Sequence, residues 1–228
     1  MIRAVIFDLY DTLLYLDPAR IHETRRALAH RAGVDAAAWA ELWSANILDR
    51  MLGRLGGLED EIRTMLRQLG ADPSPGLVTE LARMETAGWA AAVTIYPETV
   101  PTLAALRERG LLVGLITNAS AQAGGVLEEI GLAQHFDAVV LSCMVGVVKP
   151  DAAIYLHTCR QLGVAPANSM FVADGAFTEL DGAKAVGMVA VKIEQANQSG
   201  DYGTSMSFDY EIVRLTEVLR LLDMDAHT

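Results

Sequence analysis

The chain opens on an apolar run that ends at an acidic residue. Residues 4–7 read Ala-Val-Ile-Phe, and Asp8 follows them directly. Such a run is typical of a buried strand, and open α/β sheets bind their ligands at the carboxyl ends of their strands. The opening therefore predicts an α/β protein in which Asp8 reaches the ligand-binding edge of the sheet as a nucleophile or a metal ligand.

The second half of the chain alternates apolar runs with helical periodicity. This alternation predicts a parallel sheet with helical crossovers, that is, a Rossmann-like three-layer α/β/α core. Strands are expected at residues 111–116, 138–141, 170–173 and 188–193. Helices are expected from 97 to 110, near 122–130, 152–162 and 180–186, and from about 210 to 222.

The segment between the first strand and this alternation has a different pattern. Residues 18–92 are rich in Ala, Leu, Arg and Glu, with breaks near Gly33, residues 56–57 and residues 72–75. The breaks predict about four helices, and no further strand is expected over residues 14–96. An inserted α-helical bundle cap explains the gap. The expected division is a core domain of residues 1–14 and 95–228 and a cap domain of residues 15–94.

Composition limits the partners and the compartment. The formal net charge of −11 argues against nucleic acid as the main partner, because that binding needs clustered Lys and Arg. No apolar run approaches the roughly 18 residues of a membrane span, and Asp8 and Asp11 interrupt the N-terminal apolar stretch. Cys143 and Cys159 lack the spacing of a metal or redox motif. We expect a cytoplasmic protein, monomeric or homodimeric, and a small anionic partner would need locally focused positive charge.

The opening residues also carry a resemblance. Residues 8–13 read Asp-Leu-Tyr-Asp-Thr-Leu, which resembles the Asp-x-Asp-x-Thr-Leu motif of the haloacid dehalogenase (HAD) superfamily. Asp8 and Thr12 fit this motif. Tyr10 stands where the phosphatases of the family carry a second Asp that handles protons, and where its haloacid dehalogenases carry Tyr.

Three later segments resemble the other motifs of this family and come in the same order. Thr117 corresponds to a hydroxyl that holds phosphoryl oxygens, with Asn118 beside it, and Lys149 to a lysine that screens charge between nucleophile and substrate. Asp174 corresponds to the metal-binding Asp of the fourth motif, and Glu179 to a second acid. The resemblance implies a Rossmann-like core with an inserted helical cap. The expected catalytic residues are Asp8, Tyr10, Thr117 and Lys149, and the expected substrate-binding residues are Thr117, Asn118 and Lys149.

A carboxylate that attacks a phosphate dianion meets like-charge repulsion, so such a site must supply cations. The resemblance implies that Lys149 and Mg²⁺ supply them. Mg²⁺ prefers oxygen ligands, and Asp8, the backbone carbonyl of Tyr10 and Asp174 would provide them whatever side chain position 10 carries. Glu179 would orient the waters of the metal.

Tyr10 leaves three functions open. A phenol has an unperturbed pKa of about 10 and cannot replace a carboxylate in proton transfer, and Asp11 is expected to point to the other side of the chain. The favoured prediction is a Mg²⁺-dependent phosphatase, weakened by Tyr10, that acts on a small phosphate ester through an aspartyl-phosphate on Asp8. The alternatives are a metal-independent 2-haloacid dehalogenase and a binding or regulatory module whose catalysis has faded.

Two features favour the phosphatase over the dehalogenase. The fourth motif has Asp174, Glu179 and residues 182–183 at the spacing of the family's phosphatases. The corresponding motif of its dehalogenases is one residue shorter. Ser44 stands where the dehalogenase cap is expected to carry an Arg that holds the substrate. Each site residue alone also has a structural interpretation, since Asp and Thr cap helices and Glu suits a first helical turn. The shared order of the motifs favours a site.

The cap is expected to close over the edge of the sheet and to select the substrate. Candidate lid contacts are Trp39, Trp43, Arg50, Arg54 and Trp89. Trp39 and Trp43 are four residues apart, which favours packing inside the cap instead.

Overall fold

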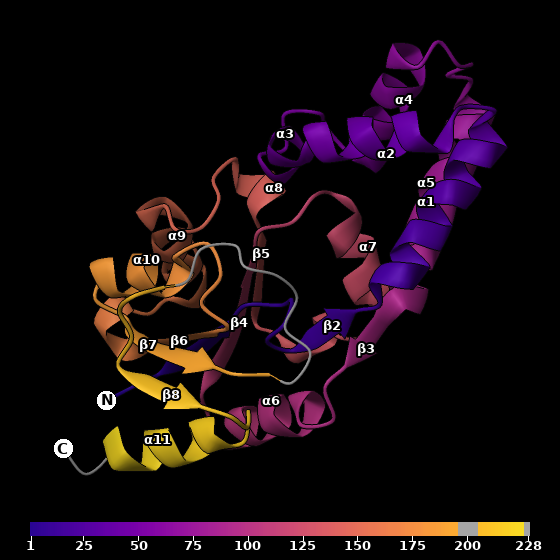
Figure 1. Ribbon diagram of the computed structural model, residues 1–228. Helices are drawn as coiled ribbons and strands as arrows, with labels where there is room; N and C mark the ends of the chain where they lie inside the picture. The colour runs from indigo at the N-terminus through magenta and orange to yellow at the C-terminus, as the bar shows by residue number, and fades with distance from the viewer. Residues whose placement is uncertain (196–204, 226–228) are drawn as a thin grey trace.

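A parallel sheet forms the centre of the computed structural model, which describes residues 1–195 and 205–225. Its strands are β1 (Ala4–Phe7), β4 (Leu112–Thr117), β5 (Ala138–Leu141), β6 (Ser169–Ala173), β7 (Val189–Ile193) and β8 (Tyr210–Ile212). They lie in the order β5-β4-β1-β6-β7-β8, and every neighbouring pair is parallel (Figure 1). The predicted α/β sheet is confirmed.

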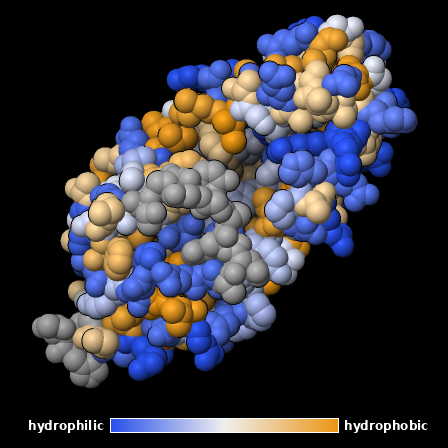
Figure 2. All heavy atoms as spheres, viewed as in Figure 1, coloured by the Kyte–Doolittle hydropathy of each residue, from blue (hydrophilic) through white to orange (hydrophobic). Residues whose placement is uncertain are grey.

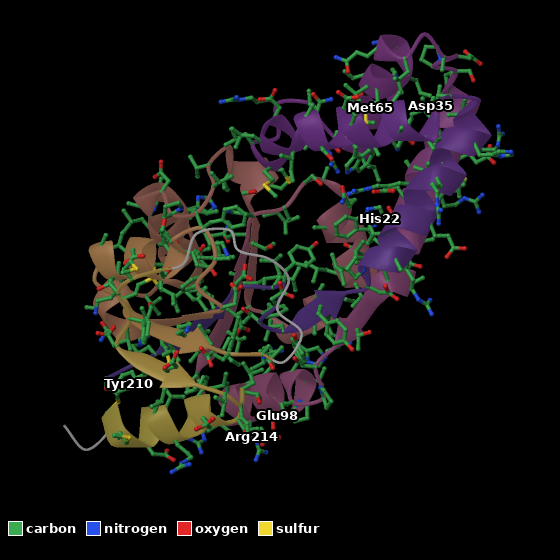
Figure 3. The ribbon with its side chains drawn as sticks, in the orientation of Figure 1. His22, Asp35, Met65, Glu98, Tyr210 and Arg214 are labelled. Carbon is green, nitrogen blue, oxygen red and sulfur yellow. The ribbon has the colours of Figure 1, made fainter. Side chains whose placement is uncertain are left out.

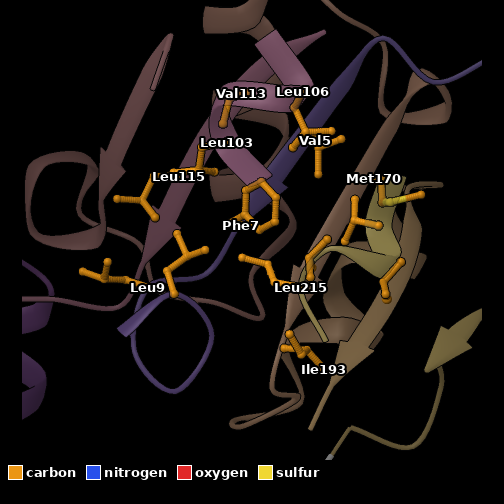
Figure 4. Close-up of a cluster of buried hydrophobic side chains, with 14 of the residues drawn as sticks. Val5, Phe7, Leu9, Leu103, Leu106, Val113, Leu115, Met170, Ile193 and Leu215 are labelled. Atoms are coloured by element: carbon orange, nitrogen blue, oxygen red, sulfur yellow. The ribbon is translucent and has the colours of Figure 1, made fainter. Parts of the chain in front are cut away.

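Helices cover both faces of the sheet because its strands are apolar on both sides. Val5 and Phe7 of β1 belong to the hydrophobic cluster on one face (Figure 4), whereas Ala4 and Ile6 belong to the cluster on the other. The first cluster includes side chains of α6 and α11, and the second side chains of α9 and α10. The helices of the core are α6 (Thr99–Glu108), α7 (Gln122–Glu129), α8 (Ser142–Val145), α9 (Ala152–Leu162), α10 (Glu179–Ala185) and α11 (Glu217–Asp225).

The helical segment forms a lobe at one side of this core (Figure 1). It contains α1 (Pro18–Ala32), α2 (Ala36–Ala45), α3 (Ile47–Met51), α4 (Leu58–Gln68) and α5 (Pro75–Ala92). Helices α1, α2, α4 and α5 share a buried cluster of their own, which includes Trp39, Trp43 and Met65; Figure 3 labels Met65. About four helices were expected, and the additional break lies at Asn46 between α2 and α3, where no Gly or Pro marks it.

Two short strands correct the expectation that residues 14–96 contain no further strand. β2 (Leu14–Leu16) and β3 (Val93–Ile95) pair antiparallel, with Leu14 opposite Ile95. Strands of three residues are too short for a recognisable alternation of apolar and polar side chains. The pair joins the two chain segments that connect the core with the helical lobe, so the entry and the exit of the lobe lie side by side (Figure 1).

The C-terminal segment differs from the prediction as well. A helix is expected from about Tyr210, but the edge strand β8 begins there and α11 starts only at Glu217. Main-chain pairing of Tyr210 with Val191 of β7 overrides the local helical pattern. Arg214 then donates from Nε to Oε1 of Glu98 at 2.9 Å, which holds the segment before α11 against the start of α6 (Figure 3).

The surface of the described chain carries both polar and apolar side chains. Figure 2 shows apolar side chains gathered over α3 and α8, where Ile47 and Met144 are exposed. Cys159 is buried and Cys143 half-buried, and both are free thiols. Among the described residues, no helix is long and apolar enough to span a membrane. Residues 197–207 contain Gly and Ser, which predicts a surface loop, but most of this segment lies outside the described residues.

Candidate active site

Three neighbouring strands bring the predicted site residues to one edge of the sheet. Asp8 follows β1, Thr117 ends β4 and Asp174 follows β6, and β1 lies between the other two strands. The Asp8 amide donates to the carbonyl of Val172 at 2.9 Å, and the Asp174 amide donates to Oγ1 of Thr12 at 3.1 Å. Thr12 therefore positions the turn that carries Asp174.

Lys149 is the buried cation of the site. It is 4% exposed, and its Nζ donates to Oδ1 of Asp8 and to Oε2 of Glu179. The side chain of Asn118 accepts from the Lys149 amide at 2.8 Å and donates to its carbonyl at 3.1 Å. Asn118 thus holds the backbone of Lys149 in place, while a contact between Asn118 and substrate stays a prediction.

Two of the three carboxylates at this edge contact Lys149, and Asp174 lies beside them. Asp8, Asp174 and Glu179 each offer an oxygen that lies within 4.8 Å of the other two. Burial raises the pKa of Asp8 to about 6, against the opposing charge of Lys149, and the charge of Asp174 adds to the rise. Burial also raises the pKa of Glu179. For Lys149, burial lowers the pKa, but the charges of Asp8 and Glu179 outweigh burial and raise it.

This cluster has one lysine for three acids, so it carries surplus negative charge in a buried setting. A donor set made of carboxylate oxygens alone fits a hard divalent cation such as Mg²⁺. Asp8 and Asp174 are the predicted side-chain ligands. Glu179 is already engaged at both oxygens, because Oε2 accepts from Lys149 and Oε1 accepts from the Gly175 amide at 3.3 Å.

Thr117 presents a hydroxyl without a partner. Its side chain is fully buried, and its Oγ1 has no hydrogen-bond partner among the described residues. Because a buried hydroxyl without a partner costs free energy, such an atom marks a place where a ligand can bind. Thr117 lines the same pocket as Asp8 and Lys149. The hydroxyl is therefore available to a ligand oxygen beside the carboxylate of Asp8.

Tyr10 and Asp11 both line this pocket. The ring of Tyr10 packs edge-on against Trp89 at 6.2 Å between centroids, and burial together with the charge of Asp8 raises the phenol pKa, so Tyr10 stays protonated. Strand alternation was the reason for expecting Asp11 to point to the other side of the chain from Asp8, and the backbone does not support that reason. The strand ends at Phe7 and Asp11 has a φ of 56°, so the alternation of a strand does not apply to it.

The pocket has a volume of about 260 Å³ and lies between the sheet edge and the helical lobe. Of the candidate lid contacts, Arg50 and Trp89 line it, whereas Trp39 and Trp43 lie in the core of the lobe. Arg54 instead pairs with an exposed aspartate on the surface of the lobe. Sequence reasoning missed three polar lining residues, which are Arg25, Ser120 and Gln122. The last two follow Thr117 closely, and this proximity to a strand end could have found them.

Arg50 connects the lobe to the core. Its Nε donates to Oε2 of Glu61 at 2.9 Å, and its Nη2 donates to Oγ of Ser120 at 3.1 Å and to Oε1 of Gln122 at 2.9 Å. The guanidinium lies 3.7 Å from the ring centroid of Trp43. Ser44, where the dehalogenase resemblance expects an Arg, is exposed and does not line this pocket.

Comparisons with known proteins agree with this geometry. The family model for haloacid dehalogenase-like hydrolases matches residues 2–187. A glyceraldehyde 3-phosphate phosphatase of Methanopyrus kandleri is 32% identical over 86% of this chain and 85% of its own length. An (S)-2-haloacid dehalogenase 4A of Burkholderia cepacia is 27% identical over 97% of this chain and 95% of its own.

Two solved structures share the fold over nearly the whole chain. A HAD phosphatase from Thermococcus onnurineus is 28% identical with a TM-score of 0.68, and the match covers 97% of this chain and 98% of that one. A 2-haloacid dehalogenase from Pseudomonas syringae pv. Tomato is 25% identical with a TM-score of 0.76, covering 98% and 99%. This chain is therefore a member of the haloacid dehalogenase-like hydrolases.

Proposed function

We propose that this hydrolase is a Mg²⁺-dependent phosphatase that acts on small phosphate esters through an aspartyl-phosphate on Asp8. The observation that carries the proposal is the cluster of Asp8, Asp174 and Glu179, of which Asp8 and Glu179 pair with Lys149, beside the unpartnered hydroxyl of Thr117. Dehalogenation of a singly charged acid would not need this surplus of carboxylates. The similarity to a glyceraldehyde 3-phosphate phosphatase supports the same choice.

The chemistry follows from the positions of these groups. A carboxylate oxygen of Asp8 attacks phosphorus, the bond from phosphorus to the ester oxygen breaks, and the leaving group departs as an alkoxide that takes a proton from solvent to become the alcohol. Water then attacks phosphorus, which releases phosphate and restores the carboxylate of Asp8. Lys149 holds Asp8 in place and screens its charge, and the hydroxyl of Thr117 donates to a phosphoryl oxygen. Held by Asp8, Asp174 and the backbone carbonyl of Tyr10, Mg²⁺ would neutralise phosphoryl charge.

At this site we expect proton transfer to and from the reacting oxygens to be slow. The raised pKa of Tyr10 makes its phenol a much weaker proton donor to a leaving alkoxide than a carboxylic acid would be, and a protonated phenol cannot take a proton from the attacking water. We therefore expect slow turnover of alkyl phosphates, whose leaving group needs a proton, and faster turnover of aryl phosphates, whose leaving group does not.

Hydrolysis of p-nitrophenyl phosphate tests the proposal. We expect release of nitrophenol with Mg²⁺, loss of release with excess EDTA, and a decrease of at least ~10³-fold in Asp8→Asn because the nucleophile is gone. Asp60→Asn, an exposed aspartate on the helical lobe that pairs with Arg63, is the matched control and should keep wild-type activity. Undiminished release by Asp8→Asn, or equal release in EDTA, would contradict the proposal.

Tyr10 keeps the dehalogenase as a second candidate, because it lines the pocket in a fold shared with a solved 2-haloacid dehalogenase. Release of chloride from 2-chloropropionate in EDTA, together with no release of nitrophenol, would favour that function. Absence of both activities in a folded protein would favour a binding module instead.

A further inference from the structure

The part of the helical lobe that faces Asp8 is charged and buried. Arg50 of α3 is 4% exposed, and Arg25 of α1 is half-buried, and both line the pocket that contains Asp8. Behind them lie Glu61 of α4 and Glu85 of α5, which are both fully buried. We call these two arginines and two glutamates the roof cluster.

Hydrogen bonds hold the guanidinium of Arg50 in one orientation. Nε is bonded to Glu61 and Nη2 to Ser120 and Gln122, and the face of the group lies on Trp43. Within the described residues no protein group bonds Nη1, and this nitrogen is not among the buried atoms without a partner. The remaining N–H groups of Arg50 are therefore free to donate to a ligand in the pocket.

The roof cluster offers hydrogen-bond donors without net positive charge. Glu61 forms a buried ion pair with Arg50 at 2.9 Å between Oε2 and Nε. Glu85 and Arg25 act on each other through their charges, and each shifts the pKa of the other toward its ionised form. At pH 8, above the pKa of about 7 of Glu85, two positive groups are thus opposed by two negative ones. A second anionic group on the substrate would find an N–H donor here but no uncompensated cation.

We infer that Arg50 is a specificity-determining residue that donates to a neutral hydroxyl or carbonyl oxygen of the leaving alcohol, and that Glu61 makes the site select against a leaving alcohol that carries a carboxylate. The inference rests on the phosphatase function proposed above. The substrate class is then the monophosphates of small polyols and hydroxycarbonyl compounds. Phosphorylated hydroxy acids of the same size are disfavoured, because the carboxylate would lose its hydration without gaining a free counter-charge.

Two three-carbon substrates test this inference. Glycerol 3-phosphate and 3-phosphoglycerate differ in whether the far carbon is a hydroxymethyl group or a carboxylate. At pH 8 with Mg²⁺, we expect wild-type kcat/KM to be about tenfold or more higher for glycerol 3-phosphate. Glu61→Gln keeps an oxygen that can accept from Arg50 but removes the opposing charge. We expect this variant to shift the ratio of the two kcat/KM values toward 3-phosphoglycerate by about tenfold.

Glu41→Gln is the matched control. It removes one charge from the same lobe at an exposed position of α2 that does not line the pocket, so its kcat/KM ratio should equal that of the wild type. Circular dichroism and turnover of p-nitrophenyl phosphate establish that Glu61→Gln is folded. A folded and active Glu61→Gln with the wild-type ratio would overturn the inference, and so would an equal shift in Glu41→Gln.

If Glu61→Gln does not fold, the ratio of the two kcat/KM values in the wild type tests the inference instead. Equal or better use of 3-phosphoglycerate by the wild type overturns the inference, whereas a clear preference for glycerol 3-phosphate supports it. Hydrolysis of p-nitrophenyl phosphate separates the two proposals. If the wild type hydrolyses this ester but does not discriminate between the three-carbon substrates, only the inference fails. If it hydrolyses no phosphate ester, the proposed function fails as well.

Discussion

At the scale of single residues, Tyr10 separates this site from a complete phosphatase site. Tyr10 is half-buried and lines the pocket, its ring rests against Trp89, and the charge of Asp8 helps to keep the phenol protonated. Asp11 lines the same pocket but lies one residue further along the chain. A carboxylate introduced at position 10 would restore a group that can both give and accept a proton.

Tyr10→Asp should raise kcat/KM for glycerol 3-phosphate by up to roughly 10²-fold and kcat/KM for p-nitrophenyl phosphate much less, because kcat/KM reports the step in which the alcohol leaves and only the alkyl leaving group needs a proton there. Tyr10→Asn is the control, since it makes the same space beside Trp89 without adding a carboxylate. Steady-state kinetics on both esters measures the effect. An equal gain on both, or the same gain in Tyr10→Asn, would show that position 10 is not the missing acid and base.

At the scale of elements, the close approach of α10 to the segment that follows Lys149 builds the charged centre. The Tyr155 hydroxyl of α9 donates to the Glu179 carbonyl at 2.7 Å, which fixes the start of α10. Gly182 makes the approach possible, because an added Cβ would lie 2.5 Å from the carbonyl oxygen of Pro150. Lys149 can reach Glu179 only while these two segments stay in contact.

Gly182→Ala should therefore lower the free energy of unfolding by about 1–3 kcal/mol despite the better helix propensity of Ala, since the backbone must shift to relieve the overlap. We also expect lower kcat on p-nitrophenyl phosphate, because the shift separates Lys149 from Glu179. Urea denaturation measures the stability. Gly57→Ala is the control, since nothing lies within 4 Å of its added Cβ and its φ of −77° suits Ala. Equal stability of Gly182→Ala and wild type would contradict the packing argument.

At the scale of the whole molecule, the lobe and the core enclose charged groups that make stability depend on pH. Burial raises the pKa of Glu85 to about 7 from 4.5, although Arg25 and Arg50 oppose the rise. Between these two values the folded protein binds more protons than the unfolded chain. The contribution of Glu85 to stability therefore falls as pH rises from about 4.5 to about 7 and is constant above that window.

Glu85→Gln should remove this loss, because Gln resembles the protonated acid and can still accept from Nε1 of Trp89. Relative to wild type, we expect the variant to be more stable at pH 8 by on the order of 2 kcal/mol and similar in stability at pH 5. Urea denaturation at both pH values measures the difference, with Glu41→Gln as the exposed control. A difference that does not change between pH 5 and pH 8 would contradict the assigned titration.

Much of the core was predictable, because its signals are local. Buried parallel strands are continuous apolar runs, and β1, β4, β5, β6 and β7 match the expected segments. β2, β3 and β8 were not predicted, because strands of three residues have no period and are stabilised by pairing with distant partners. The break at Asn46 was not predicted for a similar reason, since no Gly or Pro separates α2 from α3.

The sequence by itself determined the family, the α/β core and the residues at the strand ends, because parallel strands deliver their last side chains to one edge wherever the helices lie. Only the tertiary structure decided that Lys149 lies between Asp8 and Glu179, that Asn118 holds the backbone of Lys149, and that Arg50 reaches across from the lobe. The face that a helix turns toward a pocket depends on what packs behind it. The sequence gives the identity of each side chain, but the rotation of the helix about its axis, which sets the direction of that side chain, depends on tertiary packing.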